Sequence, residues 1–123
     1  MKIEDELITR ADLGKLLENN SGVLIIKFGA KWCGPCKNIE GLVHQYFEMM
    51  PNEISTIEVD IDDAFDIYGF LRSKKIVNGI PVILAYFKGN THYTPDDMVV
   101  GVDPTKIKQF FSRCVIQSKE KAI

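Results

Sequence analysis

Apolar residues recur along this chain with two different periods, and the first part of the pattern predicts a helix followed by a strand. Thr9, with Asp12 three residues later, has the form of a helix cap. The expected helix carries an apolar stripe of Leu13, Leu16 and Leu17. The stretch Val23–Phe28 is then almost continuously apolar, which is typical of a strand buried on both faces. The chain therefore begins with a helix–strand unit.

The middle of the chain predicts a helix, a strand and another helix. The turn Cys33–Cys36 opens a helix that Pro51 ends and that buries Ile39, Leu42, Val43, Tyr46, Phe47 and Met50. The next predicted strand is Ile54–Asp60. Asp62 or Asp63 is expected to cap the third helix, which carries the apolar residues Phe65, Ile67, Tyr68 and Leu71.

The last third of the chain predicts a hairpin and a terminal helix. Its strands are Pro81–Phe87 and Met98–Val100, with a turn signal at 88–90. Asp103 caps a final helix that has Pro104 at its first position and a core face of Ile107, Phe110, Phe111, Cys114 and Val115. Residues 118–123 are expected to form a frayed polar tail. This order predicts a single α/β domain over 1–123, with a mixed sheet between helices.

Composition narrows the possible functions. The chain has 123 residues, 46% of them hydrophobic, which suits one globular domain. The net charge is −2 without a basic cluster, so we expect neither a nucleic-acid partner nor a membrane surface. The longest apolar runs are too short to span a bilayer. The first ten residues carry three acids and no apolar leader, so we expect a cytoplasmic protein, although a processed mature form would look the same.

Three cysteines are too few for a disulfide scaffold, and two of them form a C-x-x-C pair. Such a pair is either catalytic or part of a metal site. A zinc site needs about four ligands. The other candidates, Cys114, His44 and His92, form no second paired motif, so we expect no metal and no cofactor. Cys114 is interpreted as a small core residue, and the two histidines as surface residues without a role.

The spacing of Cys33 and Cys36 suits dithiol–disulfide chemistry. Two intervening residues in a first helical turn bring two sulfurs within bridging distance. The positive end of the helix favours a thiolate on Cys33, below the pKa of ~8.5 of a free cysteine. Cys36, inside the helix, is expected to be more shielded and to suit the resolving role.

These residues also resemble a known family. The segment Phe28–Lys37, which reads FGAKWCGPCK, resembles the active-site segment of thioredoxins. Two further matches follow in order: Gly79-Ile80-Pro81 resembles the cis-proline loop of that family, and Val100-Gly101 its glycine segment before the last helix. The resemblance covers roughly residues 9 to 115. It implies the thioredoxin fold, with a central mixed β-sheet flanked by helices on both faces.

The resemblance also implies roles for individual residues. Cys33 would attack a substrate disulfide and Cys36 would resolve the mixed disulfide. Ile80 would offer its backbone to an extended substrate, with Pro81 in the cis form. The apolar docking surface would consist of Trp32, Gly34, Pro35, Val100 and Gly101. The implied partners are disulfide-containing proteins and a reductase or dithiol electron donor, and we expect a monomer.

The sequence departs from that family in two ways. Thioredoxins usually have an Asp where Lys27 stands and a Lys where Glu58 stands, and Gly29 replaces a common aromatic. A lone buried ammonium is costly, so Lys27 is expected either to pair with Glu58 and adjust the charge of the site, or to reach water. The segments 70–75 and 91–97 are also longer than usual, and the cations at 72–75 are interpreted as a solvated helix end or a docking element.

The function that these observations favour is a thiol–disulfide oxidoreductase that reduces protein disulfides. Two alternatives remain open. One is a partner-binding module that uses the cis-proline groove without redox turnover. The other is a disulfide oxidant or isomerase, which differs from a reductase in its reduction potential.

Overall fold

The computed structural model describes residues 1–121, and over this range helices and strands alternate as the pattern predicts. The elements are α1 (Arg10–Glu18), β1 (Val23–Gly29), α2 (Gly34–Met49), β2 (Ile54–Asp60), η1 (Ile61–Asp63), α3 (Phe65–Ser73), β3 (Val82–Phe87), β4 (Asp97–Val100) and α4 (Pro104–Lys121). No helix in the described range is long and apolar enough to cross a membrane.

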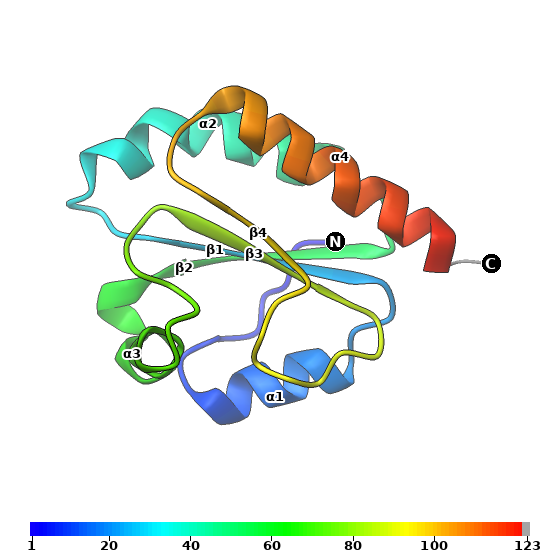
Figure 1. Ribbon diagram of the computed structural model, residues 1–123, viewed down its shortest axis with the longest axis horizontal. Coiled ribbons are helices and arrows are strands. Elements are labelled where there is room, and N and C mark those ends of the chain that lie inside the picture. Colours follow the sequence, from blue (N-terminus) through cyan, green and yellow to red (C-terminus); the bar gives the residue numbers. More distant parts are fainter. Residues whose placement is uncertain (122–123) are drawn as a thin grey trace.

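Within residues 1–121 four strands form one mixed sheet in the order β2-β1-β3-β4. The pair β1–β2 is parallel, and the other two pairs are antiparallel. Helices α2 and α4 cover one face and α1 and α3 the other (Figure 1). The predicted class, a mixed sheet with helices on both faces, is confirmed.

Strand β1 is the centre of this arrangement because every residue in it is buried. Its side chains alternate between the two faces of the sheet. Leu24, Ile26 and Phe28 belong to the core under α1 and α3, whereas Val23 and Ile25 belong to the core under α2 and α4. The same alternation places Lys27 and Gly29 on the side of α2.

The N-terminal segment runs along the outer edge of β2. Lys2 forms an isolated parallel bridge with Thr56. The N–H of Ile3 donates to the carbonyl of Thr56 at 2.8 Å, and the N–H of Thr56 donates to the carbonyl of Met1 at 2.9 Å. Residues 1–3 therefore extend the sheet by a short stretch beyond β2.

Two of the predicted helix starts are confirmed. Thr9 and Asp12 form a reciprocal capping box at α1, and Asp103 accepts hydrogen bonds from the N–H groups of Thr105 and Lys106 at the start of α4.

The expected cap of the third helix is wrong. The 3₁₀ turn η1 takes up Asp62 and Asp63, and α3 begins after Ala64 with no side-chain cap. Phe65 is exposed rather than part of the core. The buried stripe of α3 continues from Ala64 through Ile67, Tyr68 and Leu71, and Phe65 lies off that stripe.

The expectation of a frayed tail from residue 118 is wrong as far as residue 121. Helix α4 continues through this range, and Ser118 is buried. Its hydroxyl donates to the carbonyl of Val115 at 2.7 Å, so the polar group is satisfied inside the helix. Residues 122–123 lie outside the described residues.

The two segments that are longer than usual contact each other. The rings of Phe70 and Tyr93 pack edge to face with centroids 5.1 Å apart. The Nζ atom of Lys74 lies 5.7 Å from the Phe70 ring centroid and 5.9 Å from the Tyr93 ring centroid. The added lengths at 70–75 and 91–97 thus form one joint cluster on the surface.

Candidate active site

Cys33 and Cys36 are joined by a disulfide at the start of α2, with their Cα atoms 5.2 Å apart. Cys33 is the N-cap of the helix, and its Sγ accepts a hydrogen bond from the N–H of Cys36 at 3.1 Å. Pro35 lies in the first turn, where its missing N–H leaves no helical hydrogen bond unmade. The geometry expected from the spacing of the pair is confirmed.

The expected difference in shielding between the two cysteines is not found, because each is 5% exposed. Cys33 is buried to the same extent as Cys36, because both belong to a small buried cluster with Ala30. Ile61 and Ile80 pack against this cluster. Position distinguishes the two residues instead. Cys33 caps the helix and its Sγ accepts the N–H of Cys36, whereas Cys36 lies inside the first turn.

The residues expected to dock a substrate lie around this pair. Ile80 packs against the cysteine cluster, and the Ile80–Pro81 bond is cis, as predicted. The N–H of Gly101 donates to the carbonyl of Pro81 at 3.1 Å, and Val100 pairs with Val82, so the glycine segment lies beside the cis-proline loop.

The exposed part of this surface surrounds the start of α2. Trp32 is 66% exposed, and Gly34, Pro35 and Val100 are exposed as well. The indole N–H of Trp32 donates to Oδ2 of Asp62 at 2.8 Å. An apolar surface with one fixed aromatic ring therefore borders the dithiol.

Lys27 and Glu58 form the predicted pair. They are register partners on β1 and β2, and Nζ of Lys27 lies 3.2 Å from Oε1 of Glu58. The Lys27 side chain is 2% exposed and that of Glu58 is 40% exposed. The pair therefore runs from the interior to the surface, and the carboxylate stabilises an ammonium that would otherwise be buried alone.

His44 of α2 extends this pair. Its Nε2 lies 2.7 Å from Oε2 of Glu58, so the carboxylate lies between the histidine and the lysine. Partial burial acts to raise the pKa of Glu58, but the hydrogen bond with His44 and the charge of Lys27 outweigh it. The pKa of Glu58 is therefore lower than usual, which keeps the carboxylate ionised.

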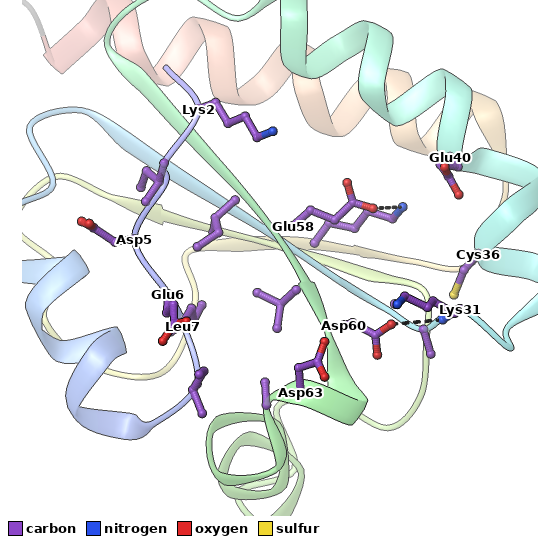
Figure 2. A pocket seen from close by; sticks show the side chains of 18 of the residues that line it. Lys2, Asp5, Glu6, Leu7, Lys31, Cys36, Glu40, Glu58, Asp60 and Asp63 are labelled. Carbon is purple, nitrogen blue, oxygen red and sulfur yellow. Dashed lines mark hydrogen bonds and ion pairs between the residues drawn. The ribbon is translucent and has the colours of Figure 1, made fainter.

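A groove of about 830 Å³ reaches the dithiol on the side of Cys36. One wall is the N-terminal segment 2–8, the other is the start of α2, and Glu58 lies between them (Figure 2). Lys27, Gly29 and Cys36 line the groove, whereas Cys33 and the docking residues Trp32, Ile80 and Val100 do not. The groove thus reaches the dithiol at Cys36 and away from the docking residues.

Gly29 leaves the space between Lys27 and Cys36 open. A Cβ atom at Gly29 would lie 3.4 Å from Sγ of Cys36 and 4.0 Å from Cε of Lys27. The end of the lysine side chain and the sulfur therefore border the same small volume on one face of β1. A larger side chain at position 29 would separate them.

The described residues contain no group of three or more His, Cys, Asp or Glu side chains that could hold a metal ion. Cys114 lies fully buried in the core between the sheet and α4. Burial raises its pKa to about 12, so the thiol stays protonated and unreactive near neutral pH.

Comparison with known proteins agrees with this geometry. A family model described as thioredoxin matches residues 6–113. The chain belongs to the thioredoxin family. It is 27% identical to thioredoxin-2 of Saccharomyces cerevisiae over 104 residues. The matched segment covers 85% of this chain and 91% of the yeast protein. It is 30% identical to a thioredoxin of Staphylococcus aureus, over 79% of this chain and 84% of that protein.

Solved structures show the same fold. Thioredoxin of Fasciola hepatica superposes with a TM-score of 0.69 at 30% identity, covering 87% of this chain and 95% of the other. The fold is therefore the thioredoxin fold. Together with the Cys33–Cys36 disulfide, membership of the family makes this thioredoxin a thiol–disulfide oxidoreductase.

Two residues of the site were missed from the sequence. The sequence indicates only a surface residue at His44, although it follows Cys36 by eight residues and so lies two turns further along the same helix. The sequence indicates only a helix cap at Asp62, but this residue holds the Trp32 ring. The spacing was a usable signal for His44, whereas nothing in the sequence pairs Asp62 with Trp32.

Proposed function

We propose that this thioredoxin reduces disulfides in proteins, with Cys33 as the attacking thiolate and Cys36 as the resolving thiol. The single observation that carries this assignment is the position of Cys33 as the N-cap of α2. Its sulfur accepts the N–H of Cys36 and lies at the positive end of a 16-residue helix, and both interactions favour the thiolate over the thiol.

The reaction proceeds in two exchanges. The Cys33 thiolate attacks one sulfur of the substrate disulfide, the substrate S–S bond breaks, and the leaving thiolate takes a proton from water. Cys36 then loses its proton and attacks the Cys33 sulfur of the mixed disulfide. The Cys33–Cys36 disulfide forms and the second substrate thiolate leaves. The substrate gains two electrons and the dithiol loses two.

Substrates dock on the surface around Trp32, Gly34, Pro35, Val100 and Gly101, with an extended segment beside the backbone of Ile80 and cis Pro81. The exposure of Trp32 and Val100 beside the cysteine cluster supports this role. An apolar surface next to a polar reacting centre suits unfolded or extended protein segments better than small polar disulfides.

We infer that Lys27 and Glu58 adjust the charge at the dithiol. Lys27 borders the space next to Cys36 and is held by Glu58, and a cation near a dithiol favours its thiolate forms. The usual family residues have the opposite order, with the carboxylate inside. This thioredoxin should therefore have a more acidic, more oxidising dithiol than one with the usual pair.

The protein acts as a monomer in the cytoplasm and is re-reduced by a thioredoxin-reductase-like enzyme or another dithiol donor, which supplies electrons for repeated turnover. A reducing compartment suits this direction of exchange. Cell fractionation and sedimentation of the purified protein test location and oligomeric state.

The proposed function is tested by turnover and by trapping. With a chemical dithiol as electron donor, the wild type should reduce a model protein disulfide repeatedly. Cys33→Ser should abolish turnover, whereas Cys36→Ser should accumulate mixed disulfides with the substrate. If Cys33→Ser accumulates them instead, the two roles are reversed. Binding of the substrate without any turnover by the wild type would favour the partner-binding alternative.

A further inference from the structure

The resolving step requires the Cys36 proton to leave, and the docked substrate covers the other side of the dithiol. The groove behind Cys36 is open on the opposite side, since Cys36 lines it and the docking residues do not. Its inner end is bordered by the Lys27 side chain and by the bare backbone of Gly29. Water in this groove can therefore approach Cys36 while a substrate is bound at Cys33.

Lys27 is a charged group beside this inner end, and its side chain is buried and held by the fold. Its side chain is 2% exposed, it lies on the α2 face of β1, and its Cε borders the same space as Sγ of Cys36. A thiolate forming on Cys36 would meet an ammonium there rather than the carboxylate usual in the family. An opposite charge within a few ångströms favours the ionised form of an acid.

The position of Lys27 depends on a partner that is itself held from outside. Glu58 is 40% exposed, so its side chain is free to turn toward solvent unless something restrains it. His44 supplies that restraint, with 2.7 Å between Nε2 and Oε2, while Oε1 remains directed at Lys27. Since α2 carries both His44 and Cys36, one rigid helix sets the distance between the restraint and the reacting sulfur.

We propose that Lys27 stabilises the thiolate that forms on Cys36 in the resolving step, that the proton leaves to water in the groove opened at Gly29, and that His44 is the positioning residue that holds this arrangement through Glu58. The inference rests on the proposed function, in which Cys36 resolves the mixed disulfide. The step balances as Cys36–SH giving a thiolate and a proton taken up by groove water. The thiolate then forms the S–S bond to Cys33 as the bond to the substrate sulfur breaks.

Other charged groups also face the groove, and the experiment has to separate their effects. The N-terminal segment contributes Lys2, Glu4, Asp5 and Glu6. The start of α2 and the turn before it contribute Lys31, Lys37 and Glu40, and the end of β2 and η1 contribute Asp60 and Asp63. Lys37 is a suitable control for the loss of one positive charge, because it lines the groove without an ion pair to Glu58.

The test measures Cys36 alone. In a Cys33→Ser, Cys114→Ala background, the rate of alkylation by iodoacetamide is followed against pH. Lys27→Met should move the titration of Cys36 to higher pH and slow alkylation at pH 7 by about 10-fold or more, since a neighbouring opposite charge shifts a pKa by about 1 to 3. Lys37→Met should have a smaller effect. Lys27→Gln, which keeps a hydrogen-bond donor near Glu58, replaces Lys27→Met if that variant does not fold.

His44 is tested in the same background with a conservative and a non-conservative variant. His44→Ala should release Glu58 and slow alkylation in the same direction as Lys27→Met, whereas His44→Gln, which can still donate to the carboxylate, should restore most of the rate. The control is Gln45→Ala, an exposed neighbour on α2. An unchanged titration in Lys27→Met and Lys27→Gln overturns the inference, as does a His44→Ala profile equal to that of Gln45→Ala. These alkylation measurements need no substrate, so they test the inference about Lys27 and His44 by themselves. A failure of the proposed function would appear instead in the trapping experiment with Cys36→Ser.

Discussion

The indole N–H of Trp32 donates to a carboxylate oxygen of Asp62 at 2.8 Å, although the Trp32 ring is 66% exposed. The hydrogen bond joins the turn before α2 to the 3₁₀ turn η1 after β2, two segments separated by 30 positions. An exposed tryptophan without such a partner would sample several rotamers. Here the ring is fixed next to the dithiol before any substrate arrives.

This relationship predicts a selective effect on docking. Asp62→Ala should raise KM for a protein disulfide by about 2- to 10-fold, the equivalent of one ordinary hydrogen bond. Asp62→Asn keeps an oxygen that can accept the indole N–H and should stay close to wild type. The alkylation rate of reduced Cys33 serves as the second readout and should change little in either variant. Equal KM values for Asp62→Ala and Asp62→Asn would contradict the role given to the hydrogen bond.

A second prediction concerns the exchanged charges and the Cys33 thiolate. In a Cys36→Ser background, Lys27→Met should move the titration of Cys33 to higher pH, and in the intact dithiol it should make the reduction potential more negative. Glu58→Gln should act in the opposite direction, because the amide can still hold Lys27 in place by a hydrogen bond but no longer carries the negative charge that offsets it. Thiolate absorbance and equilibration with a glutathione buffer measure the two quantities.

The double variant closes a thermodynamic cycle. Because Nζ of Lys27 and Oε1 of Glu58 are 3.2 Å apart, the effects of the two single changes should not add. The shift at Cys33 should be smaller than that at Cys36, since the space beside Lys27 is bordered by the Cys36 sulfur. If the effects of the two single variants add, and if the pKa shift is larger at Cys33 than at Cys36, the charge of Lys27 does not act in the space beside Cys36.

Cys114 gives a third prediction, about alkaline stability. Burial raises the pKa of its thiol from the model-compound value of 9.0 to about 12. The folded state therefore retains a proton that the unfolded chain loses above about pH 9. The contribution of Cys114 is fully present below about pH 9 and is lost progressively as the pH rises toward 12.

Cys114→Ala should accordingly lose less stability than the wild type between pH 8 and pH 10, measured by denaturant unfolding under reducing conditions. At neutral pH the variant should cost about 1 kcal/mol or more for the small cavity, and its reductase activity should match that of the wild type. Loss of activity in a folded Cys114→Ala protein would show that the thiol takes part in the reaction.

The fourth prediction uses two glycines as a matched pair. A Cβ atom at Gly22 would lie 2.0 Å from the carbonyl oxygen of Glu53, which accepts the N–H of Val23 at 3.0 Å. Gly22→Ala should therefore displace the start of β1 and cost about 1–3 kcal/mol. At Gly14 in α1, no atom beyond the adjacent residues and the backbone of the same helix lies within 4 Å of the Cβ position, so Gly14→Ala should stabilise the protein by about 0.5–1 kcal/mol. Chemical denaturation of both variants measures the difference.

Most helices and strands were predicted correctly from the sequence because they are determined by interactions between residues close in sequence. The caps at Thr9 and Asp103, the buried strand β1 and the helix start at Cys33 each depend on residues close in sequence. The cost of an isolated buried charge indicated that Lys27 is paired or reaches water, and the resemblance to thioredoxins indicated Glu58 as its partner.

The misses arose where a tertiary contact or a competing local structure decided the outcome. Asp60 accepts the N–H of Asp62 and forms a separate 3₁₀ turn, so the aspartates expected to cap α3 were already used. Ser118 follows Cys114 by four residues and so continues the buried stripe of α4. The polar residue types at the end of the chain had instead predicted exposure to solvent. The role of His44 depends on a tertiary contact, because His44 on α2 meets Glu58 on β2.

The segment that runs along β2 has a consequence for self-association. A free sheet edge is a template on which a second molecule can add a strand and start aggregation. At Thr56 both backbone groups are already bonded, to Met1 and Ile3, which occupies part of the edge where β2 would accept another chain. The opposite edge is β4, which is four residues long. Residues 1–3 thus block the addition of a strand from another molecule at this part of the β2 edge.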